Sequence, residues 1–96
     1  MPAIAYGEIP IYGEWFLCKL YEMAQGIIER RFDRTEVFDA LGKKAFEDQT
    51  KRQAIDDIVQ YLKKKEWITT FENSDDVRLT DSGLTKCKEV CPTNKL

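Results

Sequence analysis

Residues 67–83 read WITTFENSDDVRLTDSG, and this stretch decides the fold because the pattern changes there from helix to strand and back. Residues 67–71 are β-branched and aromatic, which favours a strand. Asn-Ser-Asp at 73–75 is typical of a turn, and the alternation at 77–79 predicts the return strand. Thr-Asp-Ser at 80–82 is typical of a helix N-cap. The stretch therefore predicts a β-hairpin followed by a last short helix.

Two helices are predicted in the first half of the chain. Residues 13–31 place apolar side chains at the i, i+3, i+4, i+7 spacing of one helix face. Residues 35–42 predict a short second helix, which Asp33 or Thr35 can cap and Gly42 can end.

A third helix is predicted from a cap at Asp48 or Thr50 to about Lys65. Its core face consists of four apolar residues at helical spacing: Ile55, Ile58, Val59 and Leu62. Arg30 and Arg31 lie near the end of the first predicted helix, where positive charge suits the negative pole of the helix dipole, and a phosphate contact is the alternative.

The two ends of the chain are predicted to lie outside a single domain at 13–91. Residues 1–12 mix isolated isoleucines with proline and glycine, so they predict an N-terminal extended arm. Pro92 stops the last helix, and residues 92–96 predict a flexible tail.

The composition suits one small globular domain. The chain has 96 residues, of which 43% are apolar and 33% charged, so enough apolar surface exists to offset chain entropy. No apolar run approaches the roughly 18 residues that cross a bilayer, and the N-terminus lacks the basic start of a secretion signal. We therefore expect no membrane span and a cytoplasmic location. The net charge of −2 leaves only a local patch for nucleic acid.

The three cysteines are Cys18, Cys87 and Cys91. An odd number without a secretion signal favours reduced thiols that pack as small apolar residues. Cys87 and Cys91 stand one helical turn apart, but two ligands do not close a zinc site and the chain has no histidine to complete one. We therefore expect no metal and no cofactor.

The sequences TKRQAIDDIVQYLKKKEWIT and VRLTDSG, within residues 50–83, carry a family resemblance. With the predicted order of elements, they resemble the winged helix-turn-helix DNA-binding domains of small regulators of the MarR and ArsR type. The resemblance implies a mainly α fold with a small β-hairpin: a three-helix core, a two-stranded wing and a short C-terminal helix. Glu66 departs from the pattern, because such sequences usually have glycine there at a left-handed helix end. Another residue at that place costs about 1 kcal/mol, or else the turn differs.

In the family that this chain resembles, the third helix enters the DNA major groove. The face opposite its core carries glutamine and threonine, which can hydrogen-bond base edges, and lysine and arginine beside them can reach phosphates. The residues that we predict to contact double-stranded DNA are Lys43, Lys44, Gln49, Thr50, Lys51, Arg52, Gln53 and Arg78.

The tip of the hairpin argues against a second DNA contact. Glu72, Asp75 and Asp76 would repel phosphates, so only Arg78 on the return strand could serve there. Two hypotheses stay open. The chain is a DNA-binding transcriptional regulator with helix 48–65 in the major groove, or it is a winged-helix module for protein contacts with an acidic wing and no DNA binding.

Catalysis has little support, because the commonest general base, histidine, is missing and no Gly-rich phosphate loop appears. We therefore expect no enzyme and no catalytic residue. A homodimer is expected instead, because the arm and the first helix carry more apolar residues than one small core needs: Ile4, Tyr6, Ile9, Ile11, Tyr12, Trp15, Phe16 and Met23. Packing of the arm over the first helix of the same chain is the alternative.

Overall fold

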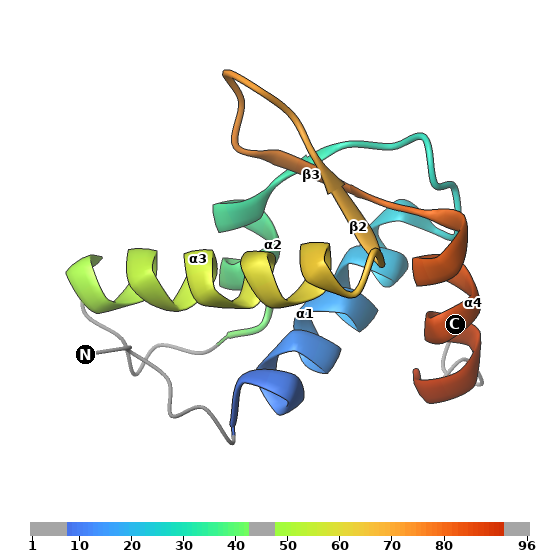
Figure 1. Cartoon of the computed structure of the whole chain (residues 1–96), viewed down its shortest axis with the longest axis horizontal. Helices are drawn as coiled ribbons and strands as arrows, with labels where there is room; N and C mark the ends of the chain where they lie inside the picture. The colour runs from blue at the N-terminus through green and yellow to red at the C-terminus, as the bar shows by residue number, and fades with distance from the viewer. Residues whose placement is uncertain (1–7, 43–47, 92–96) are drawn as a thin grey trace.

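A computed structural model describes residues 8–42 and 48–91 of the chain. The protein is mainly helical with a small antiparallel sheet, as the sequence predicts (Figure 1). In chain order, the elements are α1 (Ile9–Ala24), β1 (Phe32–Asp33), α2 (Arg34–Ala40), α3 (Asp48–Lys64), β2 (Ile68–Thr70), β3 (Asp76–Leu79) and α4 (Asp81–Val90). Three predicted parts of the chain lie outside the described residues: residues 1–7 of the arm, Lys43 and Lys44 in the connector, and the tail at 92–96.

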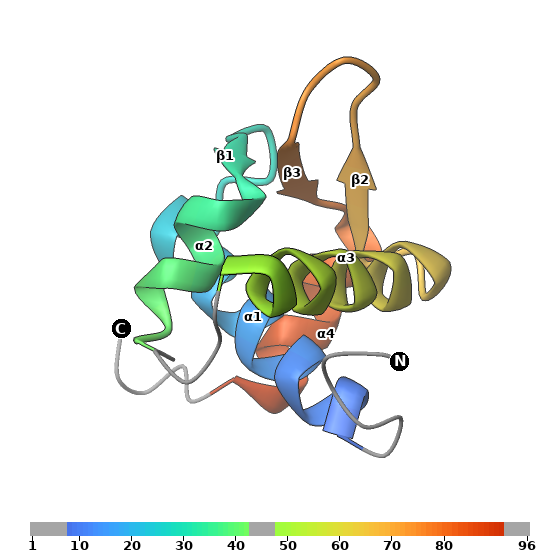
Figure 2. The ribbon, with the colours of Figure 1, turned by 90° about the vertical axis from the view of Figure 1, so that its left-hand side faces the viewer.

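The sheet has three strands in the order β1-β3-β2, so the prediction of a two-stranded wing missed one strand. Phe32 pairs with Val77 in the first ladder, and Ile68 pairs with Leu79 in the second. Figure 2 shows the three strands side by side above α3. Strand β1 has only two residues, which is too short to produce an alternating pattern.

The core lies where α1, α2, α3, α4 and one face of the sheet meet. Helix α1 packs against all three other helices, and its Phe16, Leu17 and Leu20 are fully buried. The predicted core face of α3 is confirmed, since its four apolar residues are all buried. Phe16 is therefore wrong as a dimer contact, because its exposed fraction is 0%.

Helix α1 differs at both ends from the predicted helix at 13–31. It begins at Ile9, because Pro10 occupies the first turn, where the missing N–H costs no hydrogen bond. Residues 9–12 are thus helical, and the prediction that the extended arm reaches residue 12 is wrong. The helix ends at Ala24, where Gln25 and Gly26 take positive φ angles of 55° and 79°.

The caps predicted for α2 and α4 are confirmed. The side chain of Asp33 accepts a hydrogen bond from the backbone N–H of Thr35 at 2.8 Å. The hydroxyl of Thr80 accepts one from the backbone N–H of Gly83 at 2.9 Å. Because these capping interactions are local, the starts of both helices could be predicted from the sequence.

Glu66 has the left-handed conformation that the resemblance implied, with φ of 64°. The N–H of Trp67 donates to the carbonyl of Leu62 at 3.1 Å, and the N–H of Glu66 donates to that of Lys63 at 2.9 Å. This pair of bonds is the Schellman arrangement that ends a helix. The chain keeps the turn without glycine, at a backbone cost of about 1 kcal/mol.

The prediction of three reduced thiols is wrong, because Cys18 and Cys91 form a disulfide across 73 residues of sequence. Cys87 alone is free, and burial raises the pKa of its thiol to about 12. Pairing became possible because α4 packs on α1, a contact that spacing along the chain does not reveal. In the part of the chain that the structure describes, no helix is long and apolar enough to cross a membrane.

Candidate nucleic-acid interface

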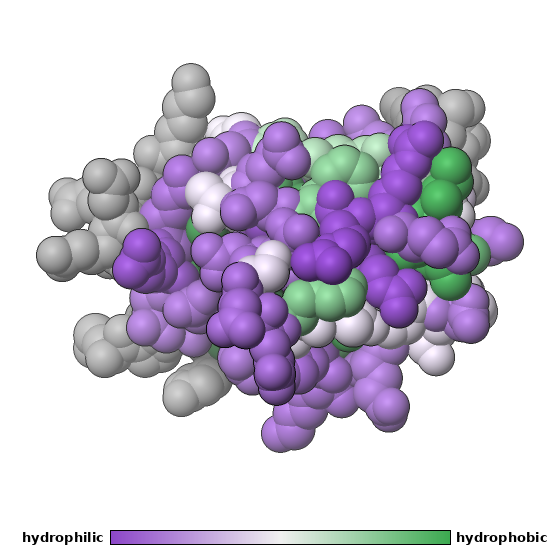
Figure 3. Space-filling model, turned by 90° about the horizontal axis from the view of Figure 1, so that it is seen from above, coloured by the Kyte–Doolittle hydropathy of each residue, from purple (hydrophilic) through white to green (hydrophobic). Residues whose placement is uncertain are grey.

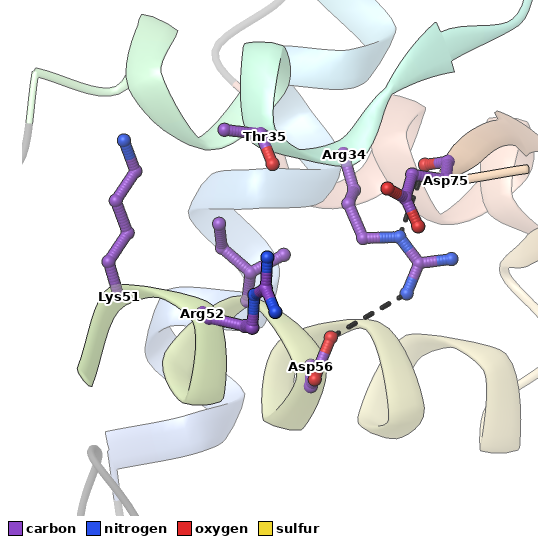
Figure 4. A pocket seen from close by; sticks show the side chains of 7 residues that line it. Arg34, Thr35, Lys51, Arg52, Asp56 and Asp75 are labelled. Carbon is purple, nitrogen blue, oxygen red and sulfur yellow. Dashed lines mark hydrogen bonds and ion pairs between the residues drawn. The ribbon is translucent and has the colours of Figure 1, made fainter. Parts of the chain in front are cut away.

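A hollow of about 460 Å³ lies between the start of α2, the first half of α3 and the hairpin (Figure 4). Seven residues line it: Arg34, Thr35, Lys51, Arg52, Ile55, Asp56 and Asp75. Three of them are cationic and two are carboxylates, so the hollow is polar and carries charges of both signs. It contains Lys51 and Arg52, two of the residues predicted from the sequence to contact DNA.

Arg34 connects the three elements around the hollow. Its backbone N–H and its side-chain Nε both donate to the carbonyl of Asp75, at 3.0 and 3.1 Å. Its Nη1 lies 3.8 Å from Oδ1 of Asp56 on α3. Only 17% of the Arg34 side chain is exposed, so this arginine fixes the position of the hairpin and α3 relative to α2.

The two basic residues of α3 differ in their availability. Lys51 forms an ion pair with Asp39 of α2, so part of its charge is compensated within the protein. Arg52 is exposed, and among residues 8–42 and 48–91 no hydrogen bond or ion pair holds its guanidinium group. Arg52 is therefore the cation at the hollow best placed to meet an external anion.

Gln53 lies next to Arg52 on the exposed side of α3. Its amide nitrogen donates to Oδ1 of Asp57 at 2.8 Å, one turn further along the helix. The amide oxygen can still accept a hydrogen bond, while the nitrogen must leave Asp57 before it can donate to a ligand. A base contact by both amide groups therefore requires a rotation of the Gln53 side chain.

Of the other predicted DNA contacts, one is placed less favourably, and the side chains of two are not described. Gln49 and Thr50 belong to the first turn of α3, but the structure describes only their backbone. Arg78 lies on β3 between the buried Val77 and Leu79, so its side chain leaves the opposite face of the sheet. It lies 6.0 Å from the ring centre of Phe71 and does not line the hollow.

Arg31 partly compensates the negative charge of the hairpin, although the sequence predicted it at the end of the first helix. Arg31 pairs with Asp76 at 3.2 Å, and its guanidinium group lies 3.7 Å above the ring centre of Phe71. Its prediction as a charge at the negative pole of the first helix is wrong, because α1 ends at Ala24. Nothing in the local pattern could reveal this pair, since its members are 45 residues apart.

The surface around the hairpin is mainly hydrophilic, with small apolar areas between the charged side chains (Figure 3). Within the described ranges, no group of three or more His, Cys, Asp or Glu side chains could hold a metal ion. The exposed chemistry near α3 is therefore that of cations, carboxylates and amides.

Comparison with known proteins gave no match to a family model, to a curated protein or to a solved structure.

Proposed function

We propose that the protein is a winged-helix transcriptional regulator that binds double-stranded DNA with α3 in the major groove. The observation that carries the proposal is the exposed pair Arg52 and Gln53 at the start of α3, beside a hollow between α2 and the hairpin. A free guanidinium group suits a phosphate, and an amide side chain suits a base edge.

The arrangement of the hairpin also supports the proposal. The hairpin directly follows α3, and Arg34 attaches it to α2 and α3. Arg31 compensates Asp76, so two carboxylates of the tip, Glu72 and Asp75, remain without a compensating ion pair among the described residues. The repulsion of DNA by the hairpin is thus smaller than the count of acidic residues in the sequence suggests.

Replacement of Arg52 by alanine is expected to weaken binding to all duplex sequences. If Arg52 contacts one phosphate, the plot of log K against log salt concentration becomes shallower by about one unit. The matched control is Lys88→Ala, which removes an exposed positive charge on α4 and should leave the slope unchanged. Fluorescence anisotropy with random duplex DNA at several salt concentrations measures both.

Replacement of Gln53 by alanine is expected to act on sequence preference instead. The loss should be on the order of 1–3 kcal/mol at one preferred base pair and small elsewhere. Selection of binding sites from a random duplex library, for wild type and variant, measures the preference at each position. If the wild type does not bind at low salt, or if both substitutions leave binding unchanged, the DNA-binding proposal fails.

The second candidate function is a winged-helix module for protein contacts. The two uncompensated carboxylates at the exposed tip, Glu72 and Asp75, favour it, because a partner with a basic surface would accept them. Failure of both DNA tests makes this tip the first surface to search for a partner.

A homodimer through α1 completes the proposal, because two half-sites multiply weak contacts to DNA. Ile11 and Trp15 lie one turn apart on α1, with exposed fractions of 51% and 42%. Ile9 and Tyr12 pack partly against the core, so they contribute less than the sequence suggested.

Sedimentation equilibrium at tens of micromolar protein is expected to give twice the mass of the 11.2 kDa chain. Replacement of the exposed Ile11 by glutamate should shift the equilibrium to the monomer, because it places a charge in an apolar contact. A wild type that sediments as a monomer would contradict the dimer. The cytoplasm remains the proposed location.

A further inference from the structure

The disulfide joins the middle of α1 to the residue that follows α4. Cys18 and Cys91 are both half-buried, and Cys91 packs partly against the core, so the bonded pair lies at the edge of the core and partly reaches the surface. Cys91 comes directly after the last helical residue, Val90. A thiol from outside can therefore approach the sulfur of Cys91 while the rest of the domain stays folded.

The start of α4 is held by contacts that do not involve the disulfide. The Thr80 hydroxyl donates to the carbonyl of Glu66 at 2.6 Å, and the Thr80 N–H donates to the carbonyl of Trp67 at 3.1 Å. Gly83 packs directly on Trp67. Opening the disulfide therefore frees the end of α4 beyond the buried Cys87 and leaves the first turn of the helix in place.

The third cysteine is kept out of exchange by its position. Cys87 is fully buried one turn before Cys91, and its Sγ lies 3.7 Å from the carbonyl of Leu17. Because burial raises the pKa of this thiol to about 12, almost none of it is thiolate near neutral pH. Cys87 therefore supplies no thiolate that could attack the mixed disulfide on Cys91 and form the wrong disulfide.

We propose that Cys18 and Cys91 form a reversible thiol–disulfide exchange site, which a dithiol reductant opens in the folded protein. One thiolate of the reductant attacks Sγ of Cys91, a mixed disulfide forms, and Cys18 leaves as a thiolate that takes a proton from water. The second thiol of the reductant then attacks the mixed disulfide. The products are two cysteine thiols in the protein and the oxidised, disulfide form of the reductant.

The consequence is local control of the end of α4. Cys18 follows Ile11 by seven residues and Trp15 by three, so all three lie on one side of α1. Reduction frees the α4 end beside this apolar pair, while α3 and the hollow at its start keep their contacts. In a reducing cytoplasm, where exposed disulfides are reduced, the open state would be the resting one.

The test uses the whole oxidised chain without denaturant. Dithiothreitol is added at several concentrations, samples are quenched with iodoacetamide, and mass spectrometry locates the alkylated cysteines. Cys18 and Cys91 should be labelled together at a rate proportional to dithiothreitol, while Cys87 stays unlabelled. Circular dichroism should show most of the helical signal retained, and oxidised glutathione should restore the disulfide.

Cys87→Ala is the matched variant, and its rate of disulfide opening should equal that of the wild type within a factor of about two. Three results would overturn the proposal. These are opening only at urea concentrations that unfold the chain, labelling of all three cysteines at one rate, and free Cys18 and Cys91 in oxidised protein before reductant is added.

Discussion

Replacing Gly83 by alanine is expected to lower the free energy of unfolding by about 3 kcal/mol, the upper part of the range for overpacked sites. A Cβ on Gly83 would overlap the carbonyl oxygen of Trp67 and lie 2.9 Å from its carbonyl carbon. These atoms belong to the backbone, so no side-chain rotation can relieve the overlap. Either α4 moves away from the junction of α3 and β2, or the hydrogen bonds of Thr80 break.

The sign of the stability change on Gly83→Ala distinguishes the effect of the Trp67 contact from that of helix propensity. Gly83 lies in the first turn of a regular helix, where alanine would by itself be favoured by up to about 1 kcal/mol. Ser82→Ala, at the exposed neighbouring position, is the control and should change stability by less than about 0.5 kcal/mol. Urea denaturation followed by circular dichroism measures both variants. Equal stability of Gly83→Ala and wild type would show that α4 does not approach Trp67 so closely.

The close approach at Gly83 also gives a physical reason for the glycine at this position. The Leu-Thr-x-x-Gly return at 79–83 requires glycine because two backbones meet there, not because of a left-handed conformation. Glu66 is the opposite case, since its left-handed conformation is kept with a side chain present. Of the two positions, Gly83 is therefore the one where a substitution should be costly.

The parts of the fold that could be predicted from the sequence are those with local causes. The apolar spacing of α3, the cap of α2 at Asp33 and the cap of α4 at Thr80 all act within a few residues. The hairpin was readable for the same reason, because its turn residues and alternation lie within one short segment. The left-handed turn at Glu66 was expected only from the resemblance, with a different turn as the alternative.

The parts that could not be predicted depend on residues far apart in the chain. Strand β1 exists because Phe32 meets Val77, and the Arg31 ion pair exists because the same approach brings Asp76 near. The first turn of α1 was missed for a different reason. Isolated isoleucines around Pro10 do not make a periodic pattern, although the position tolerates proline.

The candidate site shows the same division. Lys51, Arg52 and Gln53 could be placed on the exposed side of α3 from periodicity alone. The partner of Lys51 could not, because Asp39 comes from α2. The role of Arg34, which connects the elements around the hollow, could not be predicted from the sequence, because its two acceptors lie on α3 and the hairpin. The sequence thus predicted the candidate DNA contacts, but not which of these side chains are already paired with another side chain of the protein.

Removal of the disulfide, by Cys18→Ser with Cys91→Ser, is expected to lower the free energy of unfolding by about 4 kcal/mol. The bond closes a loop with a sequence separation of 73, and the chain-entropy model assigns roughly that value to a loop of this length. The free energy of unfolding of a small domain is only about 5–15 kcal/mol in total, so the melting temperature should fall by roughly 20 °C.

The wild type itself supplies the control for this prediction. Thermal denaturation in dithiothreitol should bring the wild type down to the stability of the double variant, while the double variant should not respond to the reductant. A wild type equal in stability to the double variant under oxidising conditions would mean that the bond contributes nothing to the fold. A loss of about 4 kcal/mol from a total of about 5–15 kcal/mol would instead mean that reduction lowers the stability of the domain while the chain stays folded. Both serines would stand at half-buried positions, one in the middle of α1 and one directly after α4, so cavity formation in the core cannot account for a loss of that size.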